Sequence, residues 1–255
     1  MFVVSRGNKI HYEAEGSGPG LVLIPGLFLN SRYWMDAGYF DAFRQDYRTI
    51  AIDPLGQGAS DRPHEAGHYR GEGLCEDIQA VLDAEGLEDA HLWGYSGGAL
   101  VAIGTAVLAP ERVRSIILGG QPPNLPMEFR PAVFQPWIDA LRAQDWEGFW
   151  SVFLPTPRAA QLQMEADNDP LAAAAAIEGM LPFEIDLGSL RAPTLSYMGS
   201  KEVFLDTVRE NAEEAGAAFH VIEDRGHVGA FQDLAAVGPI VRAHLEAVDA
   251  AGEDG

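Results

Sequence analysis

The sequence predicts an α/β protein built on a mostly parallel β-sheet. Short runs rich in Val, Ile and Leu alternate with longer segments of helical period, which is typical of βαβ units. Gly and Pro follow several of the short runs, as expected where buried strands end in turns. The length of 255 residues and the apolar content of 47% fit one globular domain, or one domain with an insertion.

The first half of the chain is predicted to form five strands and three helices. Its clearest helical signal lies over 72–85, where Leu74, Ile78 and Leu82 recur at helical spacing and Gly86 supplies a C-terminal stop. In order, the predicted elements are an edge strand over 9–15, a buried strand over 21–24, a helix near 39–45, a strand over 47–52, the helix over 72–85, a strand over 90–93, a helix over 97–108 and a strand over 113–118.

The alternation of strand and helix patterns stops after Gly119-Gly120. From residue 121 to 189 no strand pattern is evident, and proline-rich sequence leads into aromatic-rich amphipathic stretches. We therefore predict a helical insertion over 121–189 in a core formed by 1–120 and 190–255. The α/β pattern returns with a strand over 194–198, a helix over 203–215, a strand over 218–222 and a helix over 231–248, followed by a frayed tail over 249–255.

Composition excludes some partners. The 17 basic and 38 acidic residues give a net charge of −21, which repels nucleic acid and anionic membrane surfaces. No stretch approaches the ~20 apolar residues of a membrane helix, and the first residues lack a signal peptide's apolar region. Cys75 is the only cysteine, so no internal disulfide forms. We expect a soluble cytoplasmic protein, either a monomer or a homodimer.

A candidate nucleophile follows the predicted strand over 90–93. Gly94-Tyr95-Ser96-Gly97-Gly98 contains the pattern G-x-S-x-G and opens the predicted helix over 97–108. In such a turn only small residues fit beside the serine, and the hydroxyl stands exposed above the strand. Free N–H groups at the helix start favour an oxyanion. Ser96 is therefore the predicted nucleophile.

A serine hydroxyl needs a base within reach and a group that orients the base. His227 lies in the loop after the last predicted strand and is the candidate general base. Glu202, just past the preceding strand, is the candidate orienting acid, which gives the expected chain order of serine, acid and histidine. Asp206 and Glu128 remain alternatives for the acid.

These motifs together resemble the α/β-hydrolase family over nearly the whole chain. Four places carry the resemblance: residues 23–27, the segment Asp53-Pro54-Leu55-Gly56-Gln57-Gly58-Ala59-Ser60-Asp61-Arg62-Pro63, the serine turn, and Gly226-His227. The resemblance implies a twisted sheet of about eight strands, flanked by helices, with the insertion as a helical cap over the active site. It also implies an oxyanion hole made by the N–H groups of Gly97 and Leu27, with Phe28 as a less favoured donor.

Two positions depart from the family pattern. Most relatives carry His-Gly where this chain has Pro25-Gly26, so the hydrogen bonds of that histidine are absent. Relatives usually have aspartate where Glu202 stands, so the longer carboxylate must reach His227 from a more retracted backbone.

Large apolar side chains concentrate in the insertion and near the motifs. Because the insertion follows the strand just after the serine turn, we expect part of this set to line a water-poor substrate pocket. The candidate pocket residues are Phe28, Trp34, Tyr95, Phe134, Trp137, Trp150, Phe153 and Val228.

These residues favour a serine hydrolase that cleaves a carboxylic ester or lactone of a fairly apolar small molecule through an acyl-enzyme, without cofactor or metal. Carbon–carbon bond hydrolysis of a diketone and perhydrolysis remain alternatives, as does a hydrolase-like small-molecule receptor. Carbon–carbon substrates often carry a carboxylate, for which Arg130, Arg142 and Arg158 are the only cations of the insertion.

One further pattern points to different chemistry. His64-Glu65-Ala66-Gly67-His68 matches the zinc motif H-E-x-x-H, which requires a helix to bring both histidines to one face. Pro63 and Gly67 disfavour a helix there. We therefore expect a polar loop without a metal, and we expect Cys75 to be a small buried residue.

Overall fold

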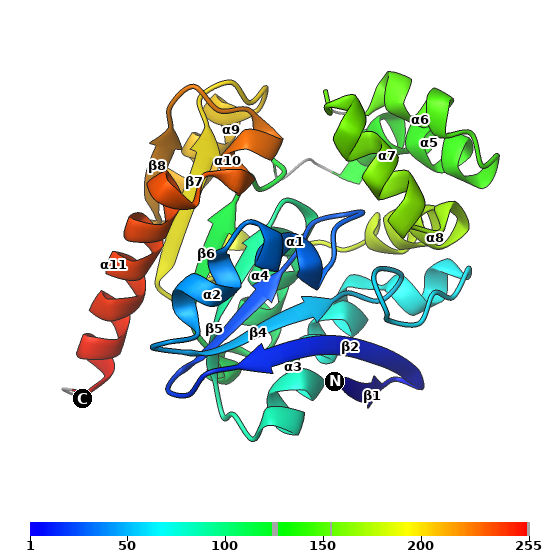
Figure 1. Ribbon diagram of the computed structural model, residues 1–255. Helices are drawn as coiled ribbons and strands as arrows, with labels where there is room; N and C mark the ends of the chain where they lie inside the picture. Colours follow the sequence, from blue (N-terminus) through cyan, green and yellow to red (C-terminus); the bar gives the residue numbers. More distant parts are fainter. Residues whose placement is uncertain (124–126, 154, 254–255) are drawn as a thin grey trace.

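The sheet of this protein has eight strands in the order β1-β2-β4-β3-β5-β6-β7-β8 (Figure 1). The computed structural model describes residues 1–123, 127–153 and 155–253. β2 pairs antiparallel with β1 and β4, and all other neighbours are parallel. This confirms the predicted fold class. The strands are β1 (Phe2–Ser5), β2 (Asn8–Glu15), β3 (Gly20–Ile24), β4 (Arg48–Asp53), β5 (Ala90–Tyr95), β6 (Val113–Gly119), β7 (Thr194–Gly199) and β8 (Ala218–Ile222).

Helices pack on both faces of the sheet. Side chains of α3 and α4 form one buried cluster with the strands, and those of α1, α2, α10 and α11 form another on the opposite face. α9 contacts β7 and β8. The helices are α1 (Ser31–Asp36), α2 (Tyr39–Phe43), α3 (Gly71–Glu85), α4 (Gly97–Leu108), α9 (Leu205–Glu214), α10 (His227–Gln232) and α11 (Leu234–Glu253).

Between β6 and β7 the described residues form helices and no strand. These helices lie together beside the sheet in Figure 1 and share a third buried cluster, which includes Phe28 from the core. These helices form the described part of the predicted insertion over 121–189, and its role as a separate cap domain stays a prediction. Its helices are α5 (Arg130–Arg142), α6 (Trp146–Val152), α7 (Arg158–Asp167) and α8 (Pro170–Met180).

Three details of the predicted secondary structure are wrong. The strand over 9–15 is not an edge, because the short strand β1 pairs outside it. The helix α1 was not predicted; it has only six residues and is capped at its N-terminus by Asn30, whose side chain accepts the N–H of Arg32. The predicted fraying from Asp249 onward is wrong for residues 249–253, because α11 continues to Glu253 and Asp249 bonds the buried ring of His91.

The carboxyl ends of the parallel strands lie along one edge of the sheet. Ile24 pairs with Gly94, and Tyr95 with Gly119, so β3, β5 and β6 end side by side. The chain leaves β3 toward β4 on one side and returns to β5 on the other, which makes the β3–β5 boundary a topological switch point. In open α/β sheets ligands bind at this crevice. Among the described residues, no helix has the length and apolar character needed to cross a membrane.

Candidate active site

Ser96 occupies a tight turn between β5 and α4. Its φ of +53° lies in a region that non-glycine residues rarely adopt. Neighbouring glycines make room for this turn: a methyl group at Gly98 would collide with the carbonyl oxygen of Ile24, and one at Gly26 would lie 2.8 Å from Ser96 Cβ. The Ser96 N–H donates to the carbonyl of Gly119 at 2.8 Å. The turn therefore holds a partly exposed serine at the switch point.

His227 and Glu202 meet at the same edge of the sheet. His227 opens α10 after β8, and Glu202 lies in the turn after β7. His227 Nδ1 and Glu202 Oε2 are 2.7 Å apart, and the other carboxylate oxygen accepts the N–H of Gly199 at 3.1 Å. The Glu202 side chain is 7% exposed, so the carboxylate is held on both oxygens in a largely dry place. Nε2 of His227 remains for another partner.

The imidazole lies close to the serine turn. A methyl group at Gly120, one residue after the acceptor of the Ser96 N–H, would lie 2.9 Å from His227 Cε1. Among the residues that the structure describes, no hydrogen bond joins the Ser96 hydroxyl to the ring. Such bonds are often long before substrate binds.

Tyr95 contacts His227 from the core of the sheet. Its hydroxyl donates to the backbone carbonyl of His227 at 2.6 Å, and the two rings lie 5.2 Å apart. Burial raises the pKa of Tyr95 well above its ordinary value, and the nearby Glu202 adds to this, so the hydroxyl stays a donor. The prediction that Tyr95 lines a pocket is wrong: the residue is 1% exposed and belongs to the core.

Two backbone N–H groups lie close together beside Ser96. A methyl group at Gly97 would lie 3.6 Å from the Leu27 nitrogen, so the two predicted oxyanion donors are neighbours. Within the described residues, neither N–H has a hydrogen-bond partner. The N–H of Phe28 donates to Gln57 Oε1 at 2.6 Å and is therefore unavailable as the alternative donor. The geometry suits anion binding at this point.

Gln57 braces the loop that carries Leu27. Its Nε2 donates to the carbonyls of Gly26 at 3.2 Å and Leu29 at 2.8 Å, while its Oε1 accepts the Phe28 N–H. The side chain is only 7% exposed. Sequence reasoning missed this contribution. The only signal was its place in the segment 53–63, which we used for the resemblance alone.

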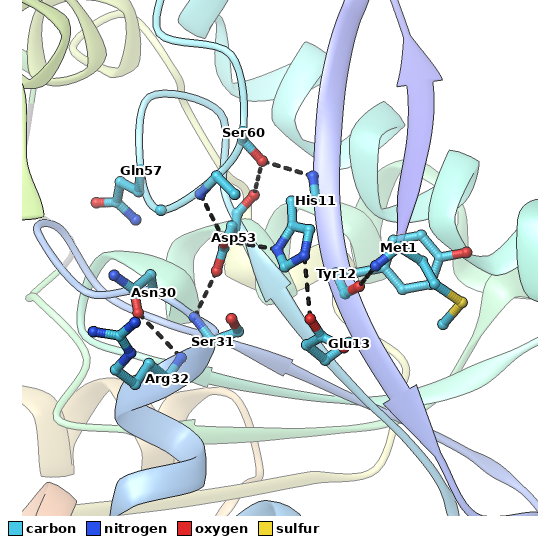
Figure 2. A network of polar contacts seen from close by, with 12 residues as sticks. Met1, His11, Tyr12, Glu13, Asn30, Ser31, Arg32, Asp53, Gln57 and Ser60 are labelled. Atoms are coloured by element: carbon cyan, nitrogen blue, oxygen red, sulfur yellow. Dashed lines mark hydrogen bonds and ion pairs between the residues drawn. The ribbon is translucent and has the colours of Figure 1, made fainter.

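Asp53 joins the loop after β3 to the loop after β4 (Figure 2). One carboxylate oxygen accepts the N–H of Ser31 at 2.7 Å, and the other accepts the N–H of Ala59 and lies 2.8 Å from His11 Nδ1. Ser60 Oγ donates to the Asp53 carbonyl at 2.5 Å. Asp53 therefore connects the start of α1, which follows the loop with Leu27, to the loop after β4 that carries Gln57.

Aromatic residues of the insertion gather on Phe28. The rings of Phe149, Trp150 and Phe153 lie 5.1, 6.2 and 5.9 Å from the Phe28 ring. Phe28 is itself 1% exposed, so its predicted place on the pocket wall is wrong, and its ring joins the loop to the insertion instead.

The other candidate pocket residues divide into two groups. Phe134 and Trp137 are half-buried members of the insertion cluster, and Val228 is half-buried beside His227. Trp34, in contrast, is fully buried in the core, where it packs on Tyr39, Trp93 and Phe231. Its predicted place on the pocket wall is wrong, because the unpredicted helix α1 turns it toward the sheet.

A second serine–histidine–aspartate group lies inside the protein. Ser115 Oγ is 2.7 Å from His91 Nδ1, and His91 Nε2 is 3.1 Å from Asp249. Ser115 and His91 have no exposed surface, and no substrate reaches them. Tyr47 also donates to Asp249, so this group fastens the end of α11 to the sheet.

The histidines of the H-E-x-x-H pattern have separate partners. The segment forms a short 3-10 turn over Ala66–Tyr69 rather than an α-helix. His64 Nε2 lies 2.8 Å from Asp169, whereas His68 Nδ1 lies 3.3 Å from Asn8 Nδ2. Cys75 is fully buried, as expected, and burial raises the pKa of its thiol to about 12.

Neither alternative acid contacts His227 in the structure. Asp206 is exposed and pairs with Arg209, and Glu128 is exposed in a 3-10 turn before α5.

Residues 19–178 match the alpha/beta hydrolase fold family. The match covers more than half of the chain, and the protein belongs to this family.

Known proteins are similar in sequence and in structure. The putative carbamate hydrolase RutD of Azorhizobium caulinodans is 32% identical over 109 residues, which cover 43% of this chain and 40% of that protein. The chain spans less than half the length of the curated relatives that it matches first. The enol-lactonase of Burkholderia xenovorans LB400 superposes with a TM-score of 0.85 at 20% identity over 96% of this chain and all of the other. Est816, described as an N-acyl homoserine lactone degrading enzyme, gives a TM-score of 0.76 at 25% identity over 95% and 99% of the two chains.

Proposed function

We propose that this protein is a serine hydrolase that cleaves a carboxylic ester or lactone of an apolar small molecule through an acyl-enzyme, without a cofactor. The observation that carries the proposal is the contact of 2.7 Å between His227 and Glu202 beside the strained turn of Ser96. A histidine oriented by a carboxylate next to a partly exposed serine is the arrangement that activates a hydroxyl for attack on a carbonyl.

The proposed reaction has two halves. Ser96 Oγ attacks the carbonyl carbon while His227 Nε2 accepts its proton, and the Leu27 and Gly97 N–H groups bind the oxyanion. His227 then gives the proton to the leaving alkoxide, which departs as an alcohol. In the second half His227 takes a proton from water, the hydroxide attacks the acyl carbon, and Ser96 regains its proton as the acid leaves.

The surroundings favour an ester or lactone over a carbon–carbon substrate with a carboxylate. Arg142 pairs with Glu178, and Arg158 pairs with Glu165 at 2.9 Å. Arg130 donates to the backbone carbonyls of Leu181 and Phe183 at 3.0 and 2.6 Å. Arg142 and Arg158 are already neutralised by carboxylates, which weakens their attraction for a substrate carboxylate.

Similar proteins and exposed apolar side chains support the same substrate class. The enol-lactonase and Est816 are named for action on lactones, and RutD for a putative action on carbamates. Val203 and Phe204, which directly follow Glu202, are 78% and 39% exposed. The half-buried rings of Trp150 and Phe153 add apolar surface on the insertion. A ligand with a sizeable apolar part fits such surroundings.

The test is steady-state turnover of p-nitrophenyl esters of increasing chain length and of simple lactones. We expect turnover that Ser96→Ala abolishes and a chelator leaves unchanged. Ser115→Ala is the matched control, since it also removes a serine hydroxyl beside a histidine, but one without access to substrate. Turnover that survives Ser96→Ala would overturn the proposal. Loss of activity on an acidic diketone after substitution of Arg142 or Arg158 would favour the carbon–carbon alternative.

A further inference from the structure

We propose that Gln57 and Asn168 are positioning residues that aim the Leu27 N–H at the substrate, so that the insertion is coupled to the oxyanion hole. This inference rests on the proposed function. It concerns two buried amide side chains that come from different parts of the chain and meet on one four-residue loop, 26–29.

The loop holds an unfavourable conformation. Phe28 has a φ of +67°, in the left-handed region that favours glycine. A residue with a large side chain keeps such a conformation only when its surroundings fix it. Hydrogen bonds at both backbone groups of Phe28 hold it in this conformation. Its N–H donates to Gln57 at 2.6 Å, and its carbonyl accepts from Asn168 Nδ2 at 2.9 Å.

Gln57 acts on the peptide that contains the Leu27 nitrogen. The carbonyl of Gly26 and the N–H of Leu27 belong to one planar peptide group and point in opposite directions. Gln57 Nε2 donates to the Gly26 carbonyl at 3.2 Å. This bond and the Leu29 N–H, which donates to the same carbonyl at 3.1 Å, together fix the plane of the peptide and so the direction of the Leu27 N–H. The Leu27 nitrogen lies 3.6 Å from the position that a Cβ of Gly97 would take.

Asn168 brings the insertion into the same arrangement. It lies between α7 and α8, is 9% exposed, and donates both to Phe28 and to the carbonyl of Met164 at 2.9 Å. Its two neighbours also contact the core: Arg62 donates to the Asp167 carbonyl at 3.0 Å, and His64 lies 2.8 Å from Asp169. Asp167, Asn168 and Asp169 thus attach the insertion to the core, and of the three only Asn168 makes a hydrogen bond to the loop 26–29.

The test uses nearly isosteric variants. Gln57→Glu keeps the acceptor for the Phe28 N–H and loses the donor to Gly26, and Asn168→Asp loses the donor to Phe28. Asn30→Asp is the matched control, because it adds the same charge beside the loop while keeping the acceptor for the Arg32 N–H. Circular dichroism and titration of active sites establish that each variant is folded and what fraction is active.

We expect kcat/KM for a p-nitrophenyl ester to fall about 10- to 100-fold in both variants, less than the roughly 10²- to 10³-fold cost of losing an oxyanion donor outright. KM should change less than threefold. The inhibition constant of phenylboronic acid, whose serine adduct is tetrahedral, should rise by the same factor as kcat/KM falls. A merely structural role would lower the active fraction and leave this constant unchanged.

Two results would overturn the inference: kcat/KM and boronate affinity within twofold of wild type in both variants, or an equal loss in Asn30→Asp. Failure of the proposed function is separately visible as wild-type turnover that survives Ser96→Ala. In that case hydrogen exchange of the backbone over 26–29 decides the positioning role. Faster exchange in Gln57→Glu and Asn168→Asp than in Asn30→Asp supports it, and unchanged exchange refutes it.

Discussion

Replacing Glu202 by glutamine tests the proposed site most directly. The change preserves the size of the side chain but replaces the oxygen that faces His227 Nδ1 by either an amide oxygen or an NH₂ group. The Gly199 N–H already occupies the other oxygen as a donor, so the amide oxygen is drawn to Gly199 and the NH₂ group faces the histidine. Nδ1 must then accept, and the proton moves to Nε2.

The magnitude follows from this change of tautomer. With its proton on Nε2, His227 has no lone pair to accept the proton of Ser96. The imidazolium that forms during attack also loses a carboxylate at 2.7 Å in a site that is mostly shielded from water. In serine proteases the equivalent change lowers kcat about 10⁴-fold, and we expect a loss of the same order here. Glu202→Asp shortens the side chain by one methylene, about 1.5 Å, and should cost less because the backbone turn can partly follow.

The assay is steady-state hydrolysis of p-nitrophenyl butyrate across pH 6 to 9, with circular dichroism to verify folding. Glu223→Gln is the matched control, since it neutralises an exposed glutamate four residues before His227. Activity of Glu202→Gln within tenfold of wild type, in an enzyme that Ser96→Ala inactivates, would refute Glu202 as the orienting acid.

Three further predictions concern other parts of the molecule. Tyr95→Phe should lower kcat about tenfold with little change in KM, and should lower the free energy of unfolding by about 1–3 kcal/mol, because the buried carbonyl of His227 loses its donor. Gln144→Gly should raise the free energy of unfolding by about 1 kcal/mol in urea, because Gln144, just past the C-cap Ala143 of α5, has a φ of +57° that favours glycine. Ala143→Gly, at a φ of −76°, should lower it. His244, whose pKa burial and the nearby His91 lower to about 4, should make the protein less stable as pH falls from 6.5 toward 4, since the unfolded chain binds the proton first. His244→Gln should reduce the stability difference between pH 7 and pH 4.5 by about 1–2 kcal/mol, after allowance for the partly exposed ring.

Each of these has a result that contradicts it. Unchanged kcat and stability in Tyr95→Phe would mean that the hydroxyl does not hold the histidine loop. Equal effects of Gln144→Gly and Ala143→Gly would show that the left-handed conformation carries no strain. The same acid sensitivity in His244→Gln and wild type would assign the loss of stability to other groups, including His91, whose pKa burial also lowers.

The fold was predictable because its elements carry local signals. The helix over Gly71–Glu85 shows its apolar face at every turn and ends at a glycine with a φ of +68°. The serine, the acid and the histidine each follow a different strand, and parallel strands bring their carboxyl ends to one edge. The serine motif and the expected chain order together predicted that Ser96, Glu202 and His227 would gather, with Asp206 and Glu128 as alternatives for the acid, and the structure brings Glu202 and His227 into contact.

Elements without a local signal were missed. β1 has only four residues, and Phe2 and Val4 are exposed. It is stabilised by its pairing with β2 rather than by an apolar pattern of its own. Tyr95 and Trp34 have the aromatic character of pocket residues. Only the packing of α1 and α10 on the sheet shows that both lie in the core. Composition cannot distinguish an aromatic side chain that faces a ligand from one that faces another aromatic ring.

The departure at Pro25-Gly26 shows why local sequence cannot fix a site made of backbone groups. Where most relatives have a histidine before the glycine, this chain has a residue that donates no hydrogen bond from its side chain. The loop is held instead by Gln57, which is 31 residues away from Gly26 in sequence and makes three contacts with the loop. Leu27 donates through its backbone, so its side chain carries no signal of the donor role, and the residues that hold the donor in place lie elsewhere in the chain. The identity of those residues can be inferred only from the folded structure.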